Sequence, residues 1–167
     1  SATLRLEFTK VLKIAFVAAP SFKKQLMRLL EDESDETAAK NIGELLVGTL
    51  DAKDKAILKR LEGYLLRVDS KNTGLIGGQI GVWETMEKLF KADSRWFTIA
   101  MTCLEKTVDS TLKTVLTRVM SHARPEHRMQ TRDVLGKLLK RSRSAAQLSL
   151  ASASVETLGK LGQANAL

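Results

Sequence analysis

Residues 37–68 read TAAKNIGELLVGTLDAKDKAILKRLEGYLLRV, and this stretch decides the fold class. Its apolar side chains recur three and four positions apart, which is the spacing of one face of an α-helix. They are Ile42, Leu45, Leu46 and Leu50 in the first half, and Ile57, Leu58, Leu61, Leu65 and Val68 in the second. Asp51 stands between the two halves as a helix cap. The pattern predicts amphipathic helices over 37–50 and 52–68.

The same spacing continues in both directions from this stretch. It predicts further helices over 3–18, from Ser21 to the acidic run, over 82–90 and 95–122, from Pro125 to about Arg143, and in the tail. The presence of only two prolines and the abundance of Leu, Lys and Glu also favour helix over a β-sandwich. We therefore expect an all-α fold, a compact domain of about eight or nine helices in two packed helical subdomains. We expect the border near the turn at 69–73 or the glycine-rich stretch that follows it, which gives an N-terminal subdomain, 1–70, and a second, basic subdomain, 71–167.

The expected core lies on the apolar stripes of these helices. We expect Leu12, Leu29, Leu46, Leu61 and Leu104 to be buried. The stretch GLIGGQIG at 74–81 lacks the Lys-Ser/Thr of a phosphate-binding loop and the spacing of a dinucleotide-binding loop. Its glycines therefore predict close helix packing against small residues.

The net positive charge of the chain is concentrated in its second half. The net charge is +8, with 13 basic and 11 acidic residues in 1–83 against 14 and 8 in 84–167. The helix expected after Pro125 concentrates basic side chains outside its apolar arc, and the candidates for a polyanion-binding surface are Arg128, Arg132, Lys137, Lys140, Arg141 and Arg143. Such a surface suits nucleic-acid phosphates or anionic lipid. Because no aromatic residue is interleaved, binding should show no sequence preference. A merely solvated basic face is the alternative.

The opposite pole of charge lies early in the chain. It consists of Glu31, Asp32, Glu33, Asp35 and Glu36. An acidic pole on one copy can meet a basic pole on the next, and a head-to-tail contact of this kind forms rows or filaments. We therefore expect the protein to associate with itself as a homo-oligomer or polymer.

No constellation in the sequence favours catalysis, a metal site or a cofactor. Cys103, His122 and His127 lack the paired spacing of zinc ligands, and neither a nucleophile elbow nor a His-Glu-x-x-His motif occurs. Cys103 lies in an apolar stretch and should be a buried packing residue, while both histidines should be solvated at helix ends. The single cysteine suits a reducing compartment, and neither a membrane-spanning run nor a signal peptide is visible. We expect a soluble protein that is not an enzyme.

The order of features in residues 11–66 resembles the N-terminal domain of orthomyxovirus matrix proteins. The segments that carry the resemblance are Val11-Leu12-Lys13-Ile14, Pro20, Lys24, Arg28-Leu29-Leu30-Glu31-Asp32, Lys40-Asn41, Gly43-Glu44-Leu45-Leu46 and Asp54-Lys55-Ala56-Ile57-Leu58. Further along, Lys137-Leu-Leu-Lys140-Arg141 is similar to that family's basic helix. The Cys-Cys-His-His element of influenza matrix proteins does not occur here. A distant genus, such as a thogotovirus, is the nearest comparison.

This resemblance implies a structural role beneath a viral envelope. Matrix proteins of this family polymerise into a layer that contacts anionic membrane on one side and ribonucleoprotein on the other. The chain would then be a fragment of a longer protein, found in the virion at the inner face of the envelope, in the host cytoplasm and nucleus, and peripherally at the plasma membrane. The residues alone leave two alternatives open. One is a helical accessory protein that binds nucleic acid without sequence specificity, and the other is a helical adaptor for a protein partner.

Overall fold

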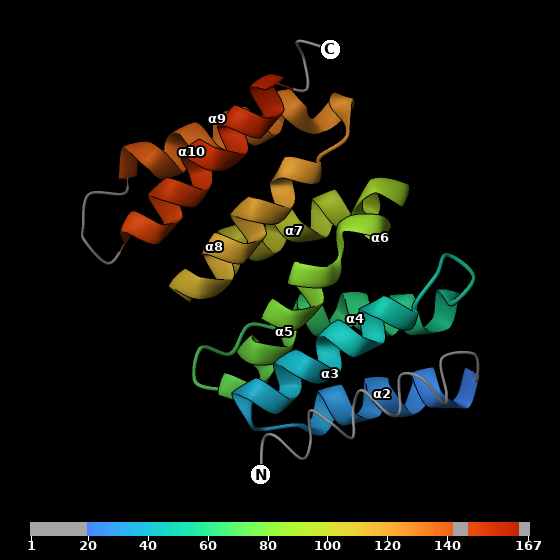
Figure 1. The fold of residues 1–167 in the computed structure, drawn as a ribbon. Helices are drawn as coiled ribbons and strands as arrows, with labels where there is room; N and C mark the ends of the chain where they lie inside the picture. The colour runs from blue at the N-terminus through green and yellow to red at the C-terminus, as the bar shows by residue number, and fades with distance from the viewer. Residues whose placement is uncertain (1–19, 142–146, 164–167) are drawn as a thin grey trace. The chain divides into compact units, whose positions relative to one another are not determined.

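A computed structural model describes residues 20–141 and 147–163, and within these ranges the chain forms nine α-helices, two short 3-10 helices and no strand (Figure 1). The all-α prediction is confirmed. The first four helices are α2 (Pro20–Asp32), α3 (Glu36–Thr49), α4 (Lys55–Leu65) and α5 (Thr73–Thr85). The others are α6 (Glu87–Ala92), α7 (Arg95–Lys106), α8 (Ser110–Val119), η1 (Met120–His122), η2 (Pro125–His127), α9 (Arg128–Arg141) and α10 (Leu148–Gln163). The helix expected over 3–18 lies outside the described residues.

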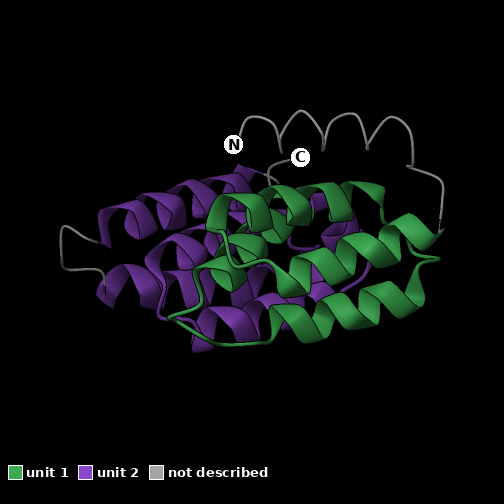
Figure 2. Ribbon diagram, turned by 90° about the horizontal axis from the view of Figure 1, so that it is seen from below, with its two compact units in different colours: residues 1–86 green, residues 87–167 purple. Residues whose placement is uncertain are grey.

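The chain divides into two compact units, unit 1 over residues 1–86 and unit 2 over residues 87–167 (Figure 2). The border predicted from the sequence lies between residues 70 and 71. Between these two positions lies α5, which packs extensively against α3 and also contacts α2. Its place within unit 1 follows from those contacts.

Glycines set the distance between α3 and α5 in unit 1. Gly74, Gly77 and Gly81 are spaced along α5 so that a Cβ atom on each would collide with a backbone carbonyl oxygen, those of Glu33, Glu36 and Lys40 respectively. Glycine has no Cβ, so the two helix backbones can approach closely along this seam. Close packing, predicted from the glycine-rich stretch, is confirmed.

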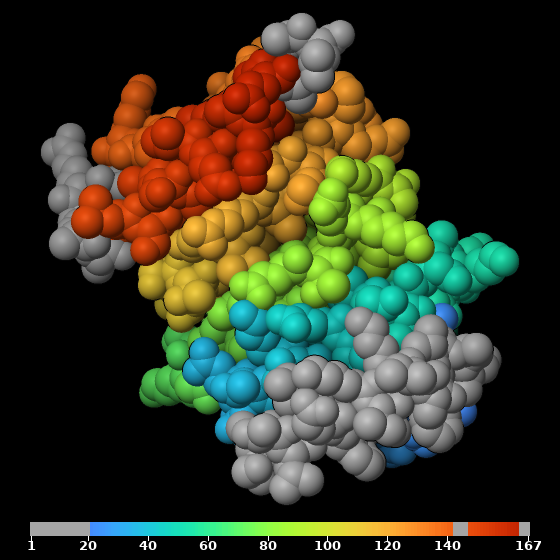
Figure 3. Space-filling model, viewed as in Figure 1, coloured from blue at the N-terminus to red at the C-terminus, as the bar shows by residue number. Residues whose placement is uncertain are grey.

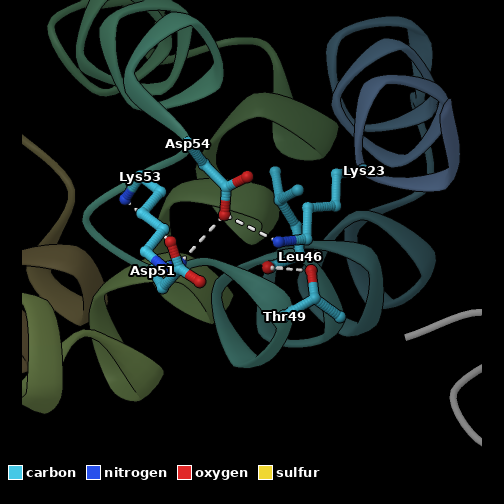
Figure 4. A network of polar contacts seen from close by, with 6 residues as sticks. All are labelled: Lys23, Leu46, Thr49, Asp51, Lys53 and Asp54. Atoms are coloured by element: carbon cyan, nitrogen blue, oxygen red, sulfur yellow. Dashed lines mark hydrogen bonds and ion pairs between the residues drawn. The ribbon is translucent and has the colours of Figure 1, made fainter. Parts of the chain in front are cut away.

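An ion pair joins α2 to the start of α4 (Figure 4). Lys23 Nζ lies 2.7 Å from Asp54 Oδ2, which also accepts a hydrogen bond from the backbone N–H of Asp51 at 3.0 Å.

The start predicted for this helix, residue 52 with Asp51 as its cap, was wrong. The helix begins at Lys55, and Asp51 forms a turn in which its Oδ1 accepts from the backbone N–H of Lys53 at 2.7 Å. Burial raises the pKa of Asp54, but the hydrogen bonds from Lys23 and Asp51 outweigh this and hold it below its usual value.

Three of the five expected core residues are confirmed. Leu46, Leu61 and Leu104 are buried, and Leu12 lies outside the described residues. Leu29 was predicted to be buried but is 55% exposed. The buried positions of α2 are Phe22, Leu26, Met27 and Leu30. At 100° per residue, Leu29 lies just outside the arc that these four residues define on the helix. Its side chain therefore remains largely exposed while theirs are buried.

In unit 2, α10 packs against α8 and α9, while α7 joins α8 to α6. The single helix expected over 95–122 is wrong, because the chain leaves helical geometry between α7 and α8. Asp109 has an extended backbone, and its Oδ1 accepts from the backbone N–H of Leu112 at 2.7 Å. This side chain satisfies an amide that would otherwise lack a partner at a helix start, so a new helix begins here.

Contacts among α8, α9 and α10 show in which direction each helix runs, and therefore which of their ends lie together. Thr157 Oγ1 in the second half of α10 donates to the Thr117 carbonyl near the end of α8 at 3.1 Å, and α10 also contacts η1, which follows α8. Later residues of one helix thus face later residues of the other, and α8 and α10 run parallel. Arg132 Nη2 near the start of α9 donates to the Leu161 carbonyl near the end of α10 at 3.4 Å, so these two run antiparallel.

Candidate polyanion-binding surface

The helix α9 forms on local signals and is held by few buried residues. Pro125 stands in the first turn of η2, where its missing N–H is harmless, and α9 continues from it. Thr131 and Leu135 are its buried side chains, and Thr131 Oγ1 donates to the His127 carbonyl at 2.9 Å. Because α9 packs on α10 by one narrow face, most of its circumference stays exposed.

The predicted basic residues differ in their exposure and partners. Arg132, Lys137, Lys140 and Arg141 are exposed, and we call these four the α9 surface. Arg128 is half-buried and interacts with at least one other residue, and Arg143 lies outside the described residues. One guanidinium nitrogen of Arg132 donates a hydrogen bond to α10. The side chains of Lys137, Lys140 and Arg141 form no hydrogen bond or ion pair with any other residue that the structure describes.

These three cations follow the spacing of one helix face. Positions 137, 140 and 141 are related by i, i+3 and i+4, so their side chains are neighbours on the helix. Like charges at this spacing repel each other by a few tenths of a kcal/mol per pair. The acidic residue nearest in sequence is Asp133, one turn earlier, and it is also exposed. The α9 surface therefore carries positive charge that the described fold does not neutralise.

Basic residues elsewhere are often paired. In unit 1, Lys23 pairs with Asp54, Lys40 with Glu84 at 2.8 Å, and Arg60 with Glu31. In unit 2, Lys91 pairs with Glu87, Arg124 with Glu126, and Lys160 with Glu156. Residues 87–167 contain 14 Lys and Arg against 7 Asp and Glu, a net charge of +7, so pairing of this kind cannot neutralise that unit.

The acidic residues that the sequence grouped into one pole have separate structural roles. Glu31 forms an ion pair with Arg60, whose Nε lies 2.8 Å from Glu31 Oε1. Glu33 Oε1 accepts hydrogen bonds from the backbone N–H groups of Ser34 and Asp35, each at 3.0 Å. Asp35 caps α3 by accepting from the Ala38 N–H at 2.8 Å. The exposed carboxylates of the run without such a bond to a described residue are Asp32 and Glu36.

Both histidines depart from the expected solvated state. The His127 ring stacks on Phe97 of α7, with centroids 4.2 Å apart and planes within 8°. His122 is half-buried, and its Nδ1 lies 3.6 Å from Glu87 Oε1. Burial lowers the pKa of His122, Glu87 opposes this, and Lys91 and Lys160 add to the lowering, so the net shift is downward. The sequence could not reveal either contact, because each joins segments far apart in the chain.

The cysteine is a buried packing residue, as predicted. Cys103 lies in the apolar face of α7 and is 6% exposed. Burial raises the pKa of its thiol to about 12, so the thiol is protonated at neutral pH and is a poor nucleophile or metal ligand.

The part of the chain that the structure describes contains neither a metal-binding cluster nor a membrane-spanning helix. No three His, Cys, Asp or Glu side chains there are grouped so that they could hold a metal ion. No helix within the same residues has both the length and the apolar character needed to cross a membrane.

Comparisons with known proteins identify no relative. No model of a known protein family matches the sequence, and neither a curated protein nor a solved structure matches the chain. The resemblance to orthomyxovirus matrix proteins thus rests on the short sequence segments given above.

Proposed function

We propose that the protein is a non-enzymatic structural protein of the viral matrix type, which binds polyanions through the α9 surface. The ligands are the headgroups of an anionic membrane and the phosphates of a ribonucleoprotein. Support comes from the segments of residues 11–66 that resemble matrix proteins and from the all-α architecture. The proposal also agrees with the net charge of +7 on residues 87–167.

One observation carries the proposal: Lys137, Lys140 and Arg141 are exposed neighbours that no described acidic residue neutralises. A basic side chain near an anionic bilayer contributes about 1 kcal/mol. Three of them therefore contribute about 3 kcal/mol, which corresponds to roughly a 100-fold change in affinity. A bound polyanion would also relieve the repulsion among the three.

The same surface fits RNA through its phosphates only. The sequence of α9, RMQTRDVLGKLLKR, contains no aromatic side chain on which a base could stack. Binding through phosphates alone weakens steeply as salt is added, because each neutralised phosphate releases counterions. We therefore expect RNA binding to be salt-sensitive and indifferent to base sequence.

Self-association completes the proposal, and the roles of the acidic residues decide how to test it. Changing Glu31 or Glu33 to lysine would disturb the ion pair with Arg60 or the turn before α3, so a loss of assembly would have two explanations. Asp32→Lys and Glu36→Lys change exposed carboxylates without those contacts. If the acidic pole contacts the basic pole of another copy, this double variant should stay monomeric at concentrations where the wild type associates.

Cosedimentation tests the proposed function. The full chain is centrifuged with vesicles of phosphatidylcholine alone, with vesicles that also contain phosphatidylserine, and separately with single-stranded RNA, while its size is followed over several concentrations. The proposal predicts binding to the anionic vesicles and to RNA, little binding to neutral vesicles, and association that increases with concentration. Binding to RNA without any binding to anionic vesicles would instead favour a nucleic-acid accessory protein. Binding to neither polyanion would refute both functions.

A further inference from the structure

One end of unit 2 combines exposed apolar side chains with exposed cations. Because α8 and α10 run parallel and α9 runs antiparallel to α10, the first residues of α8 and α10 and the last residues of α9 share this end (Figure 1). Val108, in the loop before α8, is 72% exposed, and Leu148, the first residue of α10, is 67% exposed. Val108 thus precedes α8 by two residues, and Leu148 stands at the very start of α10.

The cations at this end come from two elements. Lys140 and Arg141 are the last residues of α9, and Lys106 is the last residue of α7, two positions before Val108. All three side chains are exposed. In the space-filling view, the atoms of α10, in red-orange, and those of the start of α8, in gold, lie side by side at the surface (Figure 3). We call Lys106, Val108, Lys140, Arg141 and Leu148 the apolar–cationic end.

Acidic residues near this end are few. Asp109 lies beside Val108, but its carboxylate accepts from the Leu112 N–H as the cap of α8. Glu105 is exposed. The nearest polar neighbours, Ser110 and Ser149, are exposed and uncharged. The charge at this end is therefore positive on balance, and its partner should be an anion that also accepts apolar side chains.

We propose that the apolar–cationic end docks into the headgroup region of an anionic bilayer. Val108 and Leu148 enter the boundary between headgroups and acyl chains, while Lys106, Lys140 and Arg141 contact the headgroup phosphates. This inference rests on the proposed function and deepens it, since it states how the α9 surface meets the membrane: by the end of the helix rather than along its length.

The charge complementarity at this end favours a bilayer over the other occupants. Nucleic acid offers phosphates, but it offers no apolar layer for Val108 and Leu148. A second copy of this end would bring Lys106, Lys140 and Arg141 against the same cations, which repel. A bilayer surface provides negative charge and an apolar layer at adjacent depths, the combination that interfacial segments with basic and apolar side chains use.

A double substitution separates the apolar contribution from the charge. Val108→Ser with Leu148→Ser changes two exposed side chains, so the fold should be unaffected, and it leaves every cation in place. Each lost apolar contact should reduce the vesicle partition coefficient by about tenfold. The matched control is Met129→Ser with Val155→Ser, which alters side chains that are 78% and 61% exposed. Met129 is twelve residues before Arg141, about 18 Å along α9.

The measurement is the partition of the full chain onto phosphatidylcholine–phosphatidylserine vesicles at about 0.1 M and about 1 M salt, where charge is screened weakly and strongly. The partition coefficient of the Val108→Ser, Leu148→Ser variant should fall by about 100-fold at both salt concentrations. The partition coefficient of the control variant should match that of the wild type. Equal binding by the two double variants would overturn the docking end and leave the proposed function standing. Failure of the wild type to bind anionic vesicles would overturn both. Loss of self-association with unchanged vesicle binding would assign the end to a contact between copies and refute the inference.

A fluorescent label gives an independent readout of depth. In a Cys103→Ala background, Leu148→Cys and Val155→Cys each accept one environment-sensitive dye, at sites separated by about 10 Å along α10. With vesicles, the dye at position 148 should shift to the blue and be quenched by brominated lipid, and the dye at 155 should respond less. Equal responses at both sites, or a stronger response at 155, would contradict docking by the end.

Discussion

The two units use their charged residues differently. Residues 1–86 contain 13 basic and 12 acidic side chains, and the acidic run at 31–36 is largely occupied by an ion pair, a turn and a helix cap. Residues 87–167 contain 14 basic and 7 acidic side chains, and α9 ends in three exposed cations without a described partner. In the first unit the carboxylates of this run hold local structure, whereas in the second the cations at the end of α9 remain exposed.

Their helices differ in packing as well. In unit 1, α5 is buried on nearly every side, and its glycines bring it against the backbone of α3. In unit 2, α9 buries Thr131 and Leu135 and exposes most of the rest. A helix buried all round is sensitive to any added atom, while a peripheral helix tolerates substitution. Unit 1 should therefore respond to mutation with a loss of stability, and α9 with a loss of binding.

The largest expected effect compares a glycine in each environment. Gly81→Ala places a methyl group against the Lys40 carbonyl, and such overpacking should destabilise unit 1 by about 1–3 kcal/mol. At Gly136 in α9 no atom lies within 4 Å of an added Cβ, so Gly136→Ala should stabilise the helix by up to about 1 kcal/mol. Urea unfolding followed by circular dichroism measures both. A stabilising Gly81→Ala would show that the glycine seam does not limit the approach of α3 and α5.

A smaller effect tests how the charge in each unit is used. Asp35→Ala removes the cap of α3 and should cost about 1 kcal/mol. Lys137→Ala removes an exposed cation without a described partner and should change stability by less than about 0.5 kcal/mol. Thermal unfolding of the two variants decides the matter. If Lys137→Ala were the more destabilising, α9 would depend on a contact that the structure does not show.

The smallest effect is a difference in response to acid. His122 has a lowered pKa in the folded state, so unfolding takes up a proton, and unit 2 should begin to lose stability as the pH falls below about 6.5, the usual histidine value. Asp54 also has a lowered pKa, so its contribution to unit 1 should persist until the pH falls below about 4. His122→Gln should flatten the first loss and Asp54→Asn the second. Unfolding curves are measured at several pH values between about 6.5 and about 4. A loss of stability in unit 1 before unit 2 as the pH falls would contradict this prediction.

Sequence periodicity was enough to predict the helices and most of the core, because buried side chains must recur every three or four residues on a helix. It was not enough to place Leu29, which lies beside the buried arc of α2. The break before α8 carries a local signal, an Asp at position 109 followed by Ser110, but the apolar positions on both sides kept the helical spacing and masked it. The cap and turn roles of Glu33 and Asp35 were hidden within a run that resembled a simple acidic pole.

The candidate site also has features that could be predicted from local sequence and features that could not. The exposed cations of α9 could be predicted from one helix, since their positions depend on local spacing only. The contact between His127 and Phe97 could not, because it depends on how η2 lies against α7. The exposure of Val108 and Leu148 also depends on tertiary structure, because it is set by what packs around each residue.

The central claim is that the α9 surface, rather than positive charge in general, binds anionic membranes. The most direct measurement is the affinity for phosphatidylserine-containing vesicles as a function of salt, for the wild type and two triple variants of equal charge. Lys137→Ala, Lys140→Ala and Arg141→Ala together should reduce affinity at low salt by on the order of 100-fold and flatten its salt dependence. The matched control changes Lys53, Lys59 and Lys71 of unit 1, all exposed, to Ala and should remain close to the wild type. An equal loss in both variants, or none in the first, would contradict the claim.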